Sequence, residues 1–273
     1  MKIPSIGLGG KIVQEKNSDL ERKQYEIYKY ALTQSKCELF DTSPAYGLNE
    51  KILGDSISEY GIRENVYIIS KVTNSQQREG DIKRALDSSL DALKTDYLDA
   101  YLIHWPQAGT FLDTWKQLEL LYEEGIVKQI GVCNFQKHHF EELKLVANIQ
   151  PMFNEIEIHP LFTQETLLNY CYANCIDVIA YTPLGRMHDV LVKSKPIISL
   201  AEKYQKNVSQ IILRWHYQQK RIAIPSTLNV DHLECMNEIY DFELTDREIA
   251  WISSVNDNVR LRYNSDSCDF TRL

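Results

Sequence analysis

Four residues in the first half of the chain have side chains that could together donate a proton: Asp41, Tyr46, Lys71 and His104. A phenol has an ordinary pKa of about 10, so it is a poor acid near neutral pH. A neighbouring ammonium favours the phenolate and lowers that pKa, and we expect Asp41 to pair with Lys71 and hold it in place. His104 can donate a hydrogen bond to a substrate oxygen or serve as the acid itself. Such a site polarises and protonates a carbonyl oxygen.

Reduction of a carbonyl group also needs a hydride, which no amino-acid side chain supplies, so a cofactor is implied. The sequence offers no obvious nucleophile beside a base and no cluster of metal ligands, and we predict no metal site. His138 and His139 begin a predicted helix, which favours a solvated helix start over a metal site.

Short apolar runs alternate with longer amphipathic segments, and this alternation must position the four residues. The runs are expected to be strands, at 37–42, 66–71, 98–105, 129–135, 153–159, 177–183 and 221–226, with 5–9 as a weaker candidate for an eighth strand. Apolar residues at three- and four-residue spacing predict helices at 21–35, 81–94, 111–124 and 137–147, and the long last gap has room for two more, at 196–206 and 208–219.

Strand, helix and strand at this spacing build a parallel sheet by right-handed crossovers. We therefore predict the α/β class, as a single-domain TIM (β/α)8 barrel spanning residues 1–273. A doubly wound open sheet is the competitor, but it would want a glycine-rich turn after the first strand. Residues 6–10 lack the G-x-G-x-x-G spacing, and the chain has no phosphate loop. In a barrel, Asp41, Lys71 and His104 fall at the carboxyl ends of strands, where the chemistry lies.

The amino-acid composition excludes several classes of protein. The chain has 30 Lys and Arg against 38 Asp and Glu, a formal net charge of −8, which argues against binding to nucleic acid or to anionic membranes. No run approaches the roughly 18 apolar residues of a membrane span, and residues 1–10 lack the apolar core of a secretory signal. The six cysteines are scattered, so we expect reduced thiols and a cytoplasmic location.

Several stretches together resemble the aldo-keto reductase family, in particular its smaller microbial members. They are Phe-Asp-Thr-Ser-Pro-Ala-Tyr-Gly-Leu-Asn-Glu (40–50), Ile-Ile-Ser-Lys-Val (68–72), Tyr-Leu-Asp-Ala-Tyr-Leu-Ile-His-Trp-Pro (97–106), residues 121–135 ending in Gly-Val-Cys-Asn-Phe, Asn-Glu-Ile-Glu-Ile-His-Pro (154–160) and Ala-Tyr-Thr-Pro-Leu-Gly (180–185). The match spans nearly the whole chain in the correct order. The resemblance implies a (β/α)8 barrel that transfers a hydride from a nicotinamide dinucleotide, usually NADPH, to aldehydes and ketones.

The resemblance also assigns roles to individual residues. Tyr46 resembles the general acid, with Lys71 and Asp41 tuning it and His104 orienting the carbonyl. Asn134 and Glu155, with Cys133 beside them, would hold the nicotinamide carboxamide. Tyr181 would stack under the ring, Leu184 and Gly185 would border the pyrophosphate, and Trp105 would line the substrate pocket. Residues 258–273 would form a flap over the site.

The chain departs from the family pattern at four places. The usual Lys-Ser after Ile-Pro is Ser226-Thr227, and the usual Arg beyond it is His232, so the two cations that clamp the 2′-phosphate are absent. The family's Gln is Glu155, which loses an amide donor unless the carboxyl is protonated. The Ser before Asn134 is Cys133. An aromatic wall of the pocket is replaced by Lys11, which indicates either an anionic or strongly polar substrate or a solvated lysine on a loop.

The sequence thus predicts an NAD(P)H-dependent oxidoreductase that reduces an aldehyde or ketone to the alcohol, using NADPH or NADH. The alternative is a nicotinamide-binding regulatory or sensor subunit on the same scaffold, with weak or no turnover. The absence of the phosphate-binding cations and the presence of Glu155 are consistent with this alternative. We expect a small-molecule partner, no nucleic acid, no membrane, and a monomer.

Overall fold

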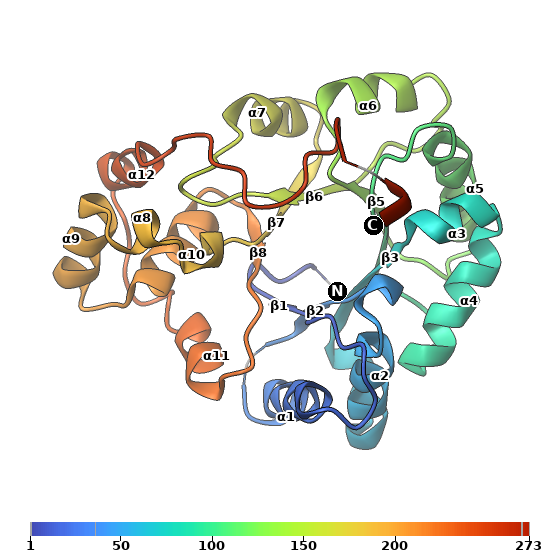
Figure 1. Ribbon diagram of the computed structural model, residues 1–273, viewed down its shortest axis with the longest axis horizontal. Helices are drawn as coiled ribbons and strands as arrows, with labels where there is room; N and C mark the ends of the chain where they lie inside the picture. Colours follow the sequence, from blue (N-terminus) through green and yellow to red (C-terminus); the bar gives the residue numbers. More distant parts are fainter. Residues whose placement is uncertain (1, 36, 269, 273) are drawn as a thin grey trace.

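Eight parallel strands form one sheet in the order β1 to β8, in a computed structural model that describes residues 2–35, 37–268 and 270–272 (Figure 1). The strands are β1 (Leu8–Gly9), β2 (Leu39–Asp41), β3 (Tyr67–Val72), β4 (Ala100–Ile103), β5 (Ile130–Cys133), β6 (Phe153–Glu157), β7 (Asp177–Tyr181) and β8 (Ile222–Ile224). Ile6 pairs in parallel with Ala223, and the Gly9 amide donates to the Pro225 carbonyl at 2.8 Å, so the first strand meets the last. The sheet closes into the predicted barrel.

Helices surround the barrel and cover the outer face of the sheet (Figure 1). They are α1 (Asp19–Thr33), α2 (Asn49–Tyr60), α3 (Asn74–Glu79), α4 (Ile82–Leu93), α5 (Phe111–Glu123), α6 (Lys137–Leu143), α7 (Glu165–Ala173), α8 (Asp189–Val192), α9 (Lys195–Tyr204), α10 (Val208–Gln218), α11 (Val230–Asn237) and α12 (Asp246–Ser253). Several begin with a capping box, at Thr73, Asn207 and Thr245. In each, the side chain of the cap residue accepts from the backbone amide of the third helical residue, and the side chain of that residue accepts from the backbone amide of the cap.

The predicted strands are all present, but all except β3 are shorter than their apolar runs, and β3 (Tyr67–Val72) has the predicted length shifted by one residue. In most of the shorter strands, the last residues of the run leave the sheet as rim loops. The run 98–105, for example, is a strand only over Ala100–Ile103. The helix predicted over 137–147 ends at Leu143, and the prediction was wrong beyond it because Leu145 is 84% exposed and not part of a buried face.

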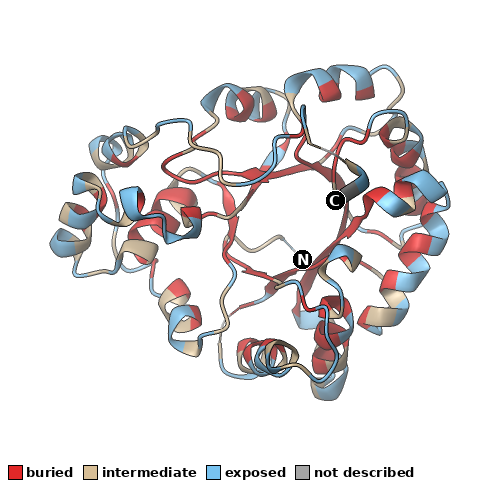
Figure 2. Cartoon of the chain, viewed as in Figure 1, coloured by how far each residue is buried: buried red, intermediate tan, exposed pale blue. Residues whose placement is uncertain are grey.

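The interior of the barrel is filled by side chains from alternate strand positions, including Leu39, Tyr67, Ile69, Phe153 and Ile179. A larger apolar layer lies between the sheet and the helices. Figure 2 shows buried strands at the centre and helices that are buried on the inner side and exposed on the outer. Because strand residues alternate between faces, the residues two positions further along each strand also point inward, at the carboxyl-end rim.

Candidate active site

The inward-facing positions change from apolar to polar at the carboxyl end of the barrel. Asp41 follows Leu39, Lys71 follows Ile69, Glu155 follows Phe153 and Tyr181 follows Ile179, each by two residues. The strand period therefore places these four side chains on the inner face, above the apolar filling, where four different strands converge.

Lys71 is the centre of this polar group. Its ammonium contacts a carboxylate oxygen of Asp41, lies 3.1 Å from the Thr42 carbonyl oxygen, and lies 3.5 Å from Oε2 of Glu155. The three ionisable side chains are at most 3% exposed. Burial alone would lower the pKa of Lys71, but Asp41 and Glu155 together hold that pKa well above its usual value. The predicted ion pair between Asp41 and Lys71 is confirmed, and the ammonium is permanently charged.

Tyr46 lies on the loop after β2, in a short 3₁₀ turn (Pro44–Tyr46) that Ser43 caps by accepting from the Ala45 amide. The Tyr46 carbonyl accepts from the Val13 amide at 3.0 Å, which ties this turn to the loop after β1. The next residue, Gly47, has φ +65°, and a Cβ there would lie 2.2 Å from the Val13 carbonyl oxygen. Only glycine fits this close approach, and the approach holds Tyr46 in position.

The Tyr46 ring lies between Lys71 and His104. The Lys71 ammonium is 5.2 Å from the ring centroid, and the His104 ring is 5.9 Å away at an interplanar angle of 78°. The four residues predicted to form a proton-donating site therefore converge at one rim.

The expected lowering of the Tyr46 pKa was wrong for this structure. Burial raises the pKa of the phenol, and the lowering by the Lys71 ammonium does not offset it. Among the hydrogen bonds of the described residues, none joins the Tyr46 hydroxyl to Lys71. The phenol stays protonated at every working pH, so Tyr46 holds a proton that it can give.

His104 is neutral. Burial first, and then the Lys71 ammonium, lower the pKa of His104 to about 3. Its Nδ1 lies 3.3 Å from Oγ of Ser43, which already accepts from the Ala45 amide and so has its own proton left to donate. This network favours the tautomer with the proton on Nε2. Of the two roles predicted for His104, the geometry favours the hydrogen-bond donor over the acid.

A second group of predicted residues lies at the carboxyl ends of β5, β6 and β7. The Tyr181 hydroxyl donates to Oδ1 of Asn134 at 2.7 Å, and Nδ2 of Asn134 donates to the His104 carbonyl at 3.1 Å. Asn134 has φ 63°, an uncommon backbone conformation that asparagine tolerates better than most residues. Its amide donates to the Glu155 carbonyl, and Cys133 is paired with Glu155 across β5 and β6.

This group fits a nicotinamide carboxamide. Oε2 of Glu155 is buried and has no hydrogen-bond partner among the described residues, and each end of the Asn134 side chain keeps capacity for one further bond. An amide with one donor and one acceptor end would satisfy a site of this composition. The Tyr181 ring, whose hydroxyl bonds to Asn134, offers an aromatic surface on which a nicotinamide ring could stack.

The residues predicted to meet the rest of the cofactor lie on the loops after β7 and β8. Leu184 and Gly185 lie at the start of a 3₁₀ turn after β7 (Gly185–Met187). Thr227 and His232 approach each other, with Oγ1 and Nδ1 3.4 Å apart, and both are outside the barrel core with exposed Ser226 beside them. The sequence departures at the expected phosphate clamp therefore fall together on one patch of the rim.

The two other predicted substrate residues, Trp105 and Lys11, lie on the loops after β4 and β1. Trp105 stacks near His104 and meets Phe270 of the C-terminal segment at 6.3 Å between ring centroids. Lys11 lies on the β1 loop, between Gly10, whose amide donates to the Asp41 carbonyl, and Val13, which bonds to Tyr46. The Lys11 ammonium forms no hydrogen bond or ion pair with any described residue, and burial, followed by Arg186, lowers the pKa of Lys11.

Sequence reasoning missed the residues that position the site. Fully buried Asn49 accepts from the hydroxyls of Tyr28 and Thr42 and donates to the Lys11 carbonyl, which fastens the β1 loop beside β2. Ser43, which orients His104, was also missed. Both lie within the quoted stretch 40–50, so the family resemblance was the signal that could have found them.

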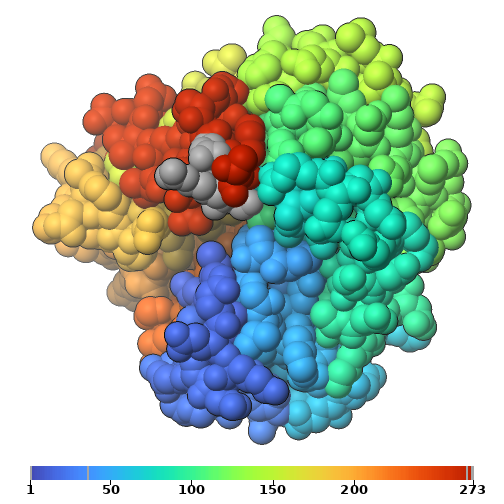
Figure 3. All heavy atoms as spheres, turned by 45° about the vertical axis from the view of Figure 1, so that its right-hand side comes forward, coloured from blue at the N-terminus to red at the C-terminus, as the bar shows by residue number. Residues whose placement is uncertain are grey.

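The C-terminal segment crosses the rim as expected for a flap (Figure 1). Glu157, fully buried at the end of β6, accepts from the amides of Leu261 and Arg262 at 2.6 and 3.0 Å and pairs with His159 at 3.0 Å. Figure 3 shows the red C-terminal segment against the cyan surface around α3. Glu157 is a second anchor that sequence reasoning missed.

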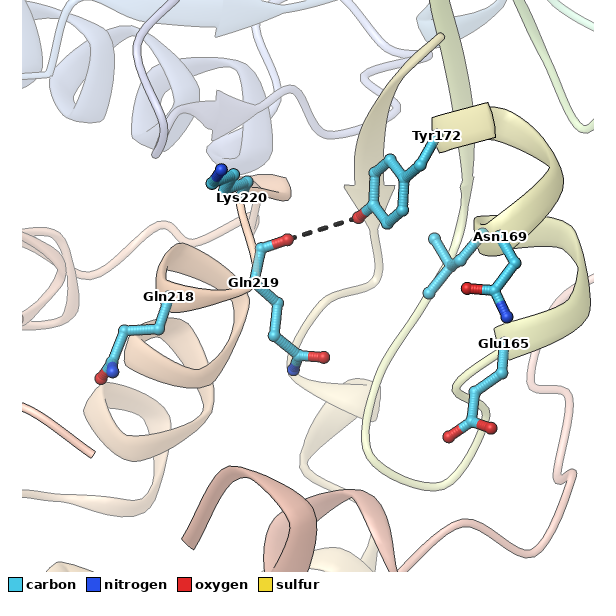
Figure 4. Close-up of a pocket in the computed structure, with 7 residues that line it drawn as sticks. Glu165, Asn169, Tyr172, Gln218, Gln219 and Lys220 are labelled. Carbon is cyan, nitrogen blue, oxygen red and sulfur yellow. Dashed lines mark hydrogen bonds between the residues drawn. The ribbon is translucent and has the colours of Figure 1, made fainter. Parts of the chain in front are cut away.

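Two other features stand apart from this rim. A surface groove of about 470 Å³ lies between α7 and α10, where the Tyr172 hydroxyl points to the Gln219 carbonyl at 3.4 Å, but it contains none of the predicted residues (Figure 4). His138, His139 and Asp266 could bring three ligand atoms within 4.8 Å of one another. Nδ1 of His139, however, accepts from the Gln136 amide, which places the ring proton on Nε2 and leaves His139 no free lone pair for a metal.

No helix in the described part of the chain is both long enough and apolar enough to span a bilayer. A model of the Aldo/keto reductase family matches residues 5–257. The chain belongs to the aldo/keto reductase family. Its fold and its rim of polar residues agree with the resemblance found in the sequence.

Relatives of known name support the same conclusion. Over 271 residues the chain is 37% identical to glyoxal reductase of Bacillus subtilis, covering 99% of this chain and 95% of that protein. It is 41% identical over 235 residues to YtbE, an uncharacterised oxidoreductase of the same organism, covering 84% and 83%. A crystal structure of an aldo-keto reductase from a deep-sea metagenome library superposes with a TM-score of 0.92 at 32% identity, covering 98% and 97%.

This aldo-keto reductase is an NAD(P)H-dependent oxidoreductase that reduces an aldehyde or ketone to the alcohol. The predictions of the family, the barrel and the reaction class are confirmed. The alternative of a regulatory or sensor subunit is not favoured, because relatives across the full length of the chain are reductases.

Proposed function

We propose that Tyr46 is the general acid of carbonyl reduction and that His104 orients the substrate. The observation that carries this proposal is the convergence of a protonated phenol, a neutral imidazole and a buried ammonium at one rim. When bound, the reduced nicotinamide ring supplies the hydride to the carbonyl carbon. The oxygen of that carbonyl group takes the Tyr46 proton, and the phenolate later regains a proton from solvent.

Each neighbouring residue favours this proton transfer. The Nε2–H of His104 would donate a hydrogen bond to the carbonyl oxygen, polarise the carbonyl group and stabilise the negative charge that develops on the oxygen as the hydride arrives. As Tyr46 loses its proton, the Lys71 ammonium stabilises the phenolate, and Asp41 keeps that ammonium fixed. Trp105 lines the substrate pocket.

For the cofactor, Asn134 and Glu155 would hold the nicotinamide carboxamide, with Cys133 beside them. Tyr181 would stack on the ring, and Leu184 and Gly185 would border the pyrophosphate. The orphaned Oε2 of Glu155 supports this placement.

We expect the enzyme to accept NADH as well as NADPH, because Ser226, Thr227 and His232 stand where cations would clamp the 2′-phosphate. Charge-assisted hydrogen bonds are worth roughly 1.5–3 kcal/mol each. The double variant Ser226→Lys, His232→Arg should therefore tighten NADPH binding at least about 10-fold and leave NADH within about 2-fold. Fluorescence titration of both cofactors measures this. A wild-type protein that binds NADPH far more tightly than NADH would contradict it.

The substrate is proposed to be an aldehyde or ketone that carries a negative charge or strongly polar groups, because the half-buried Lys11 ammonium has no hydrogen-bond or ion-pair partner among the described residues. Lys11→Met should raise KM for the anionic aldehyde glyoxylate by about 10-fold, the value of one charge-assisted contact, and leave KM for neutral para-nitrobenzaldehyde nearly unchanged. Lys16→Met, at an exposed lysine, serves as the control. An equal effect on both aldehydes would show that Lys11 does not meet the charge.

We further propose that the enzyme works as a monomer and a single domain in the cytoplasm, without nucleic-acid or membrane partners. The net charge of −8 supports the last two points.

A further inference from the structure

The polar cluster inside the barrel holds two carboxyl groups and one ammonium. Lys71 contacts Asp41 directly, whereas Oε2 of Glu155 lies 3.5 Å from the same ammonium and makes no hydrogen bond among the described residues. If both acids were ionised, the cluster would carry a net negative charge with almost no access to water. Such an uncompensated buried charge is costly, so the cluster favours one extra proton.

That proton resides on Glu155. Burial, followed by the charge of Asp41, raises the pKa of Glu155 to about 8, and Lys71 only partly opposes this. Burial also raises the pKa of Asp41, but the direct contact with the Lys71 ammonium opposes this, and we assign the ionised carboxylate to Asp41 on that contact. The other groups that face Glu155 are Tyr46 after β2, Cys133 on β5 and Tyr181 on β7, and burial raises the pKa of each, so all three are neutral. Glu155, with its longer distance to Lys71 and its unbonded Oε2, is therefore the member of the cluster that we expect to change charge near neutral pH.

We propose that Glu155 couples the redox state of the bound nicotinamide to a proton: it keeps its proton beside the neutral reduced ring and releases it when the positively charged oxidised ring binds. The inference rests on the proposed placement of the ring beside Glu155. The charges balance, because the oxidised ring brings one positive charge into the barrel and one proton leaves to solvent.

Linkage gives the direction of the pH dependence. Below a pH of about 8 the free protein must lose a proton to bind the oxidised cofactor, so its affinity rises with pH. The Kd of NAD⁺ should fall up to ~10-fold per pH unit from about pH 6 to about pH 8 and then level off. The Kd of NADH should change by less than about 2-fold over the same range, because no charge enters the barrel.

Isothermal titration calorimetry tests this on the full-length protein. Titrations in two buffers of different ionisation enthalpy count the protons released. NAD⁺ and NADH are used because neither carries the 2′-phosphate, which itself titrates near neutral pH. We expect close to one proton released with NAD⁺ at about pH 7 and none with NADH.

Two variants locate the proton. Glu155→Gln keeps the size of the side chain and cannot ionise, so NAD⁺ binding should lose both its pH dependence and its proton release. Glu50→Gln is the matched control: Glu50 is also a buried acid of raised pKa, but the hydroxyls of Ser70 and Ser89 satisfy it on the helix side of β3. The control should release protons like the wild type.

A cofactor-free measurement checks the proton itself. Since the folded pKa of Glu155 lies above its unfolded value, the stability it contributes is complete at low pH and is lost as pH rises through about 8. The unfolding constant of the wild type should thus rise up to ~10-fold per pH unit relative to Glu155→Gln between about pH 5 and about pH 8. Urea unfolding of both proteins measures the ratio.

The outcomes separate this inference from the proposed function. Binding of both cofactors with no proton release by the wild type overturns the role of Glu155 and leaves the reductase site intact. Failure of both cofactors to bind at any pH overturns the site and the inference together. If Glu155→Gln does not fold, the wild-type comparison of NAD⁺ with NADH still decides the question.

Discussion

The Lys71 ammonium is fully buried, and its charge is compensated chiefly by Asp41. Removing one partner of a buried ion pair typically costs about 3–5 kcal/mol, because the other charge is left without compensation. Lys71→Met should therefore lower the free energy of unfolding by about this amount at neutral pH. Adding Asp41→Asn to the same chain should recover most of the loss, since no charge then remains unpaired.

Urea unfolding of the two variants measures these free energies. Lys51→Met is the control, because Lys51 pairs with Asp55 at 2.5 Å on the surface, with its side chain 60% exposed. Exposed pairs contribute less than about 1 kcal/mol. A Lys71→Met protein as stable as the wild type would show that the buried cluster is not held by this pair.

Burial also explains why the pKa of Tyr46 could not be predicted from sequence. The sequence placed an ammonium near the phenol and so predicted a lowered pKa, but it did not show how completely the phenol is removed from water. Burial penalises the phenolate more than Lys71 favours it. Burial keeps the proton on Tyr46 until a carbonyl oxygen arrives, and Lys71 favours the phenolate that forms when the proton leaves.

Among the elements, the β-strands were the most predictable and the connections the least. Side chains alternate between the two faces of a strand, so the positions of Asp41, Lys71 and Glu155 on the inner face can be predicted from the sequence once the strands are recognised. Helix α2 was not singled out, because Asn49, Glu50 and Ser56 are buried in it where a search for apolar spacing expects hydrophobic residues. Glu157 was missed for another reason: its partners are 104 and 105 residues away in the chain.

The C-terminal segment is an element whose order depends on Glu157. Glu157→Gln replaces one of the two acceptor oxygens with an amide donor, which then faces either the Leu261 or the Arg262 amide. Leaving a buried donor unsatisfied costs about 1–3 kcal/mol, so hydrogen exchange at these two amides should accelerate by about 5-fold to 150-fold.

Exchange measured by NMR or mass spectrometry reads this out segment by segment. Amides of β3 should be unaffected, and the exposed Glu165→Gln variant should leave the C-terminal amides protected. Unchanged exchange in Glu157→Gln would mean that other contacts, such as Phe270 on Trp105, hold the segment in place.

In the whole molecule, the closed barrel gathers the site from many parts of the chain. β2, β3, β6 and β7 supply the inward-facing polar side chains, the loops after β1, β2 and β4 supply Lys11, Tyr46 and His104, and the C-terminal segment reaches Trp105. Eight buried parallel strands give these groups a rigid base, while the rim loops around them vary the chemistry. The departures from the family pattern, at Lys11, Glu155, Ser226 and His232, all lie in or beside this rim.

The central claim is that Tyr46 gives the proton, and turnover by Tyr46→Phe tests it most directly. The measurement is the rate of NADH or NADPH oxidation with para-nitrobenzaldehyde, together with the cofactor Kd by fluorescence, for wild type and variant. We predict a loss of turnover of at least about 10²–10⁴-fold with an unchanged cofactor Kd, because only the acid is removed. A Tyr46→Phe protein that binds cofactor and reduces the aldehyde at the wild-type rate would contradict the account.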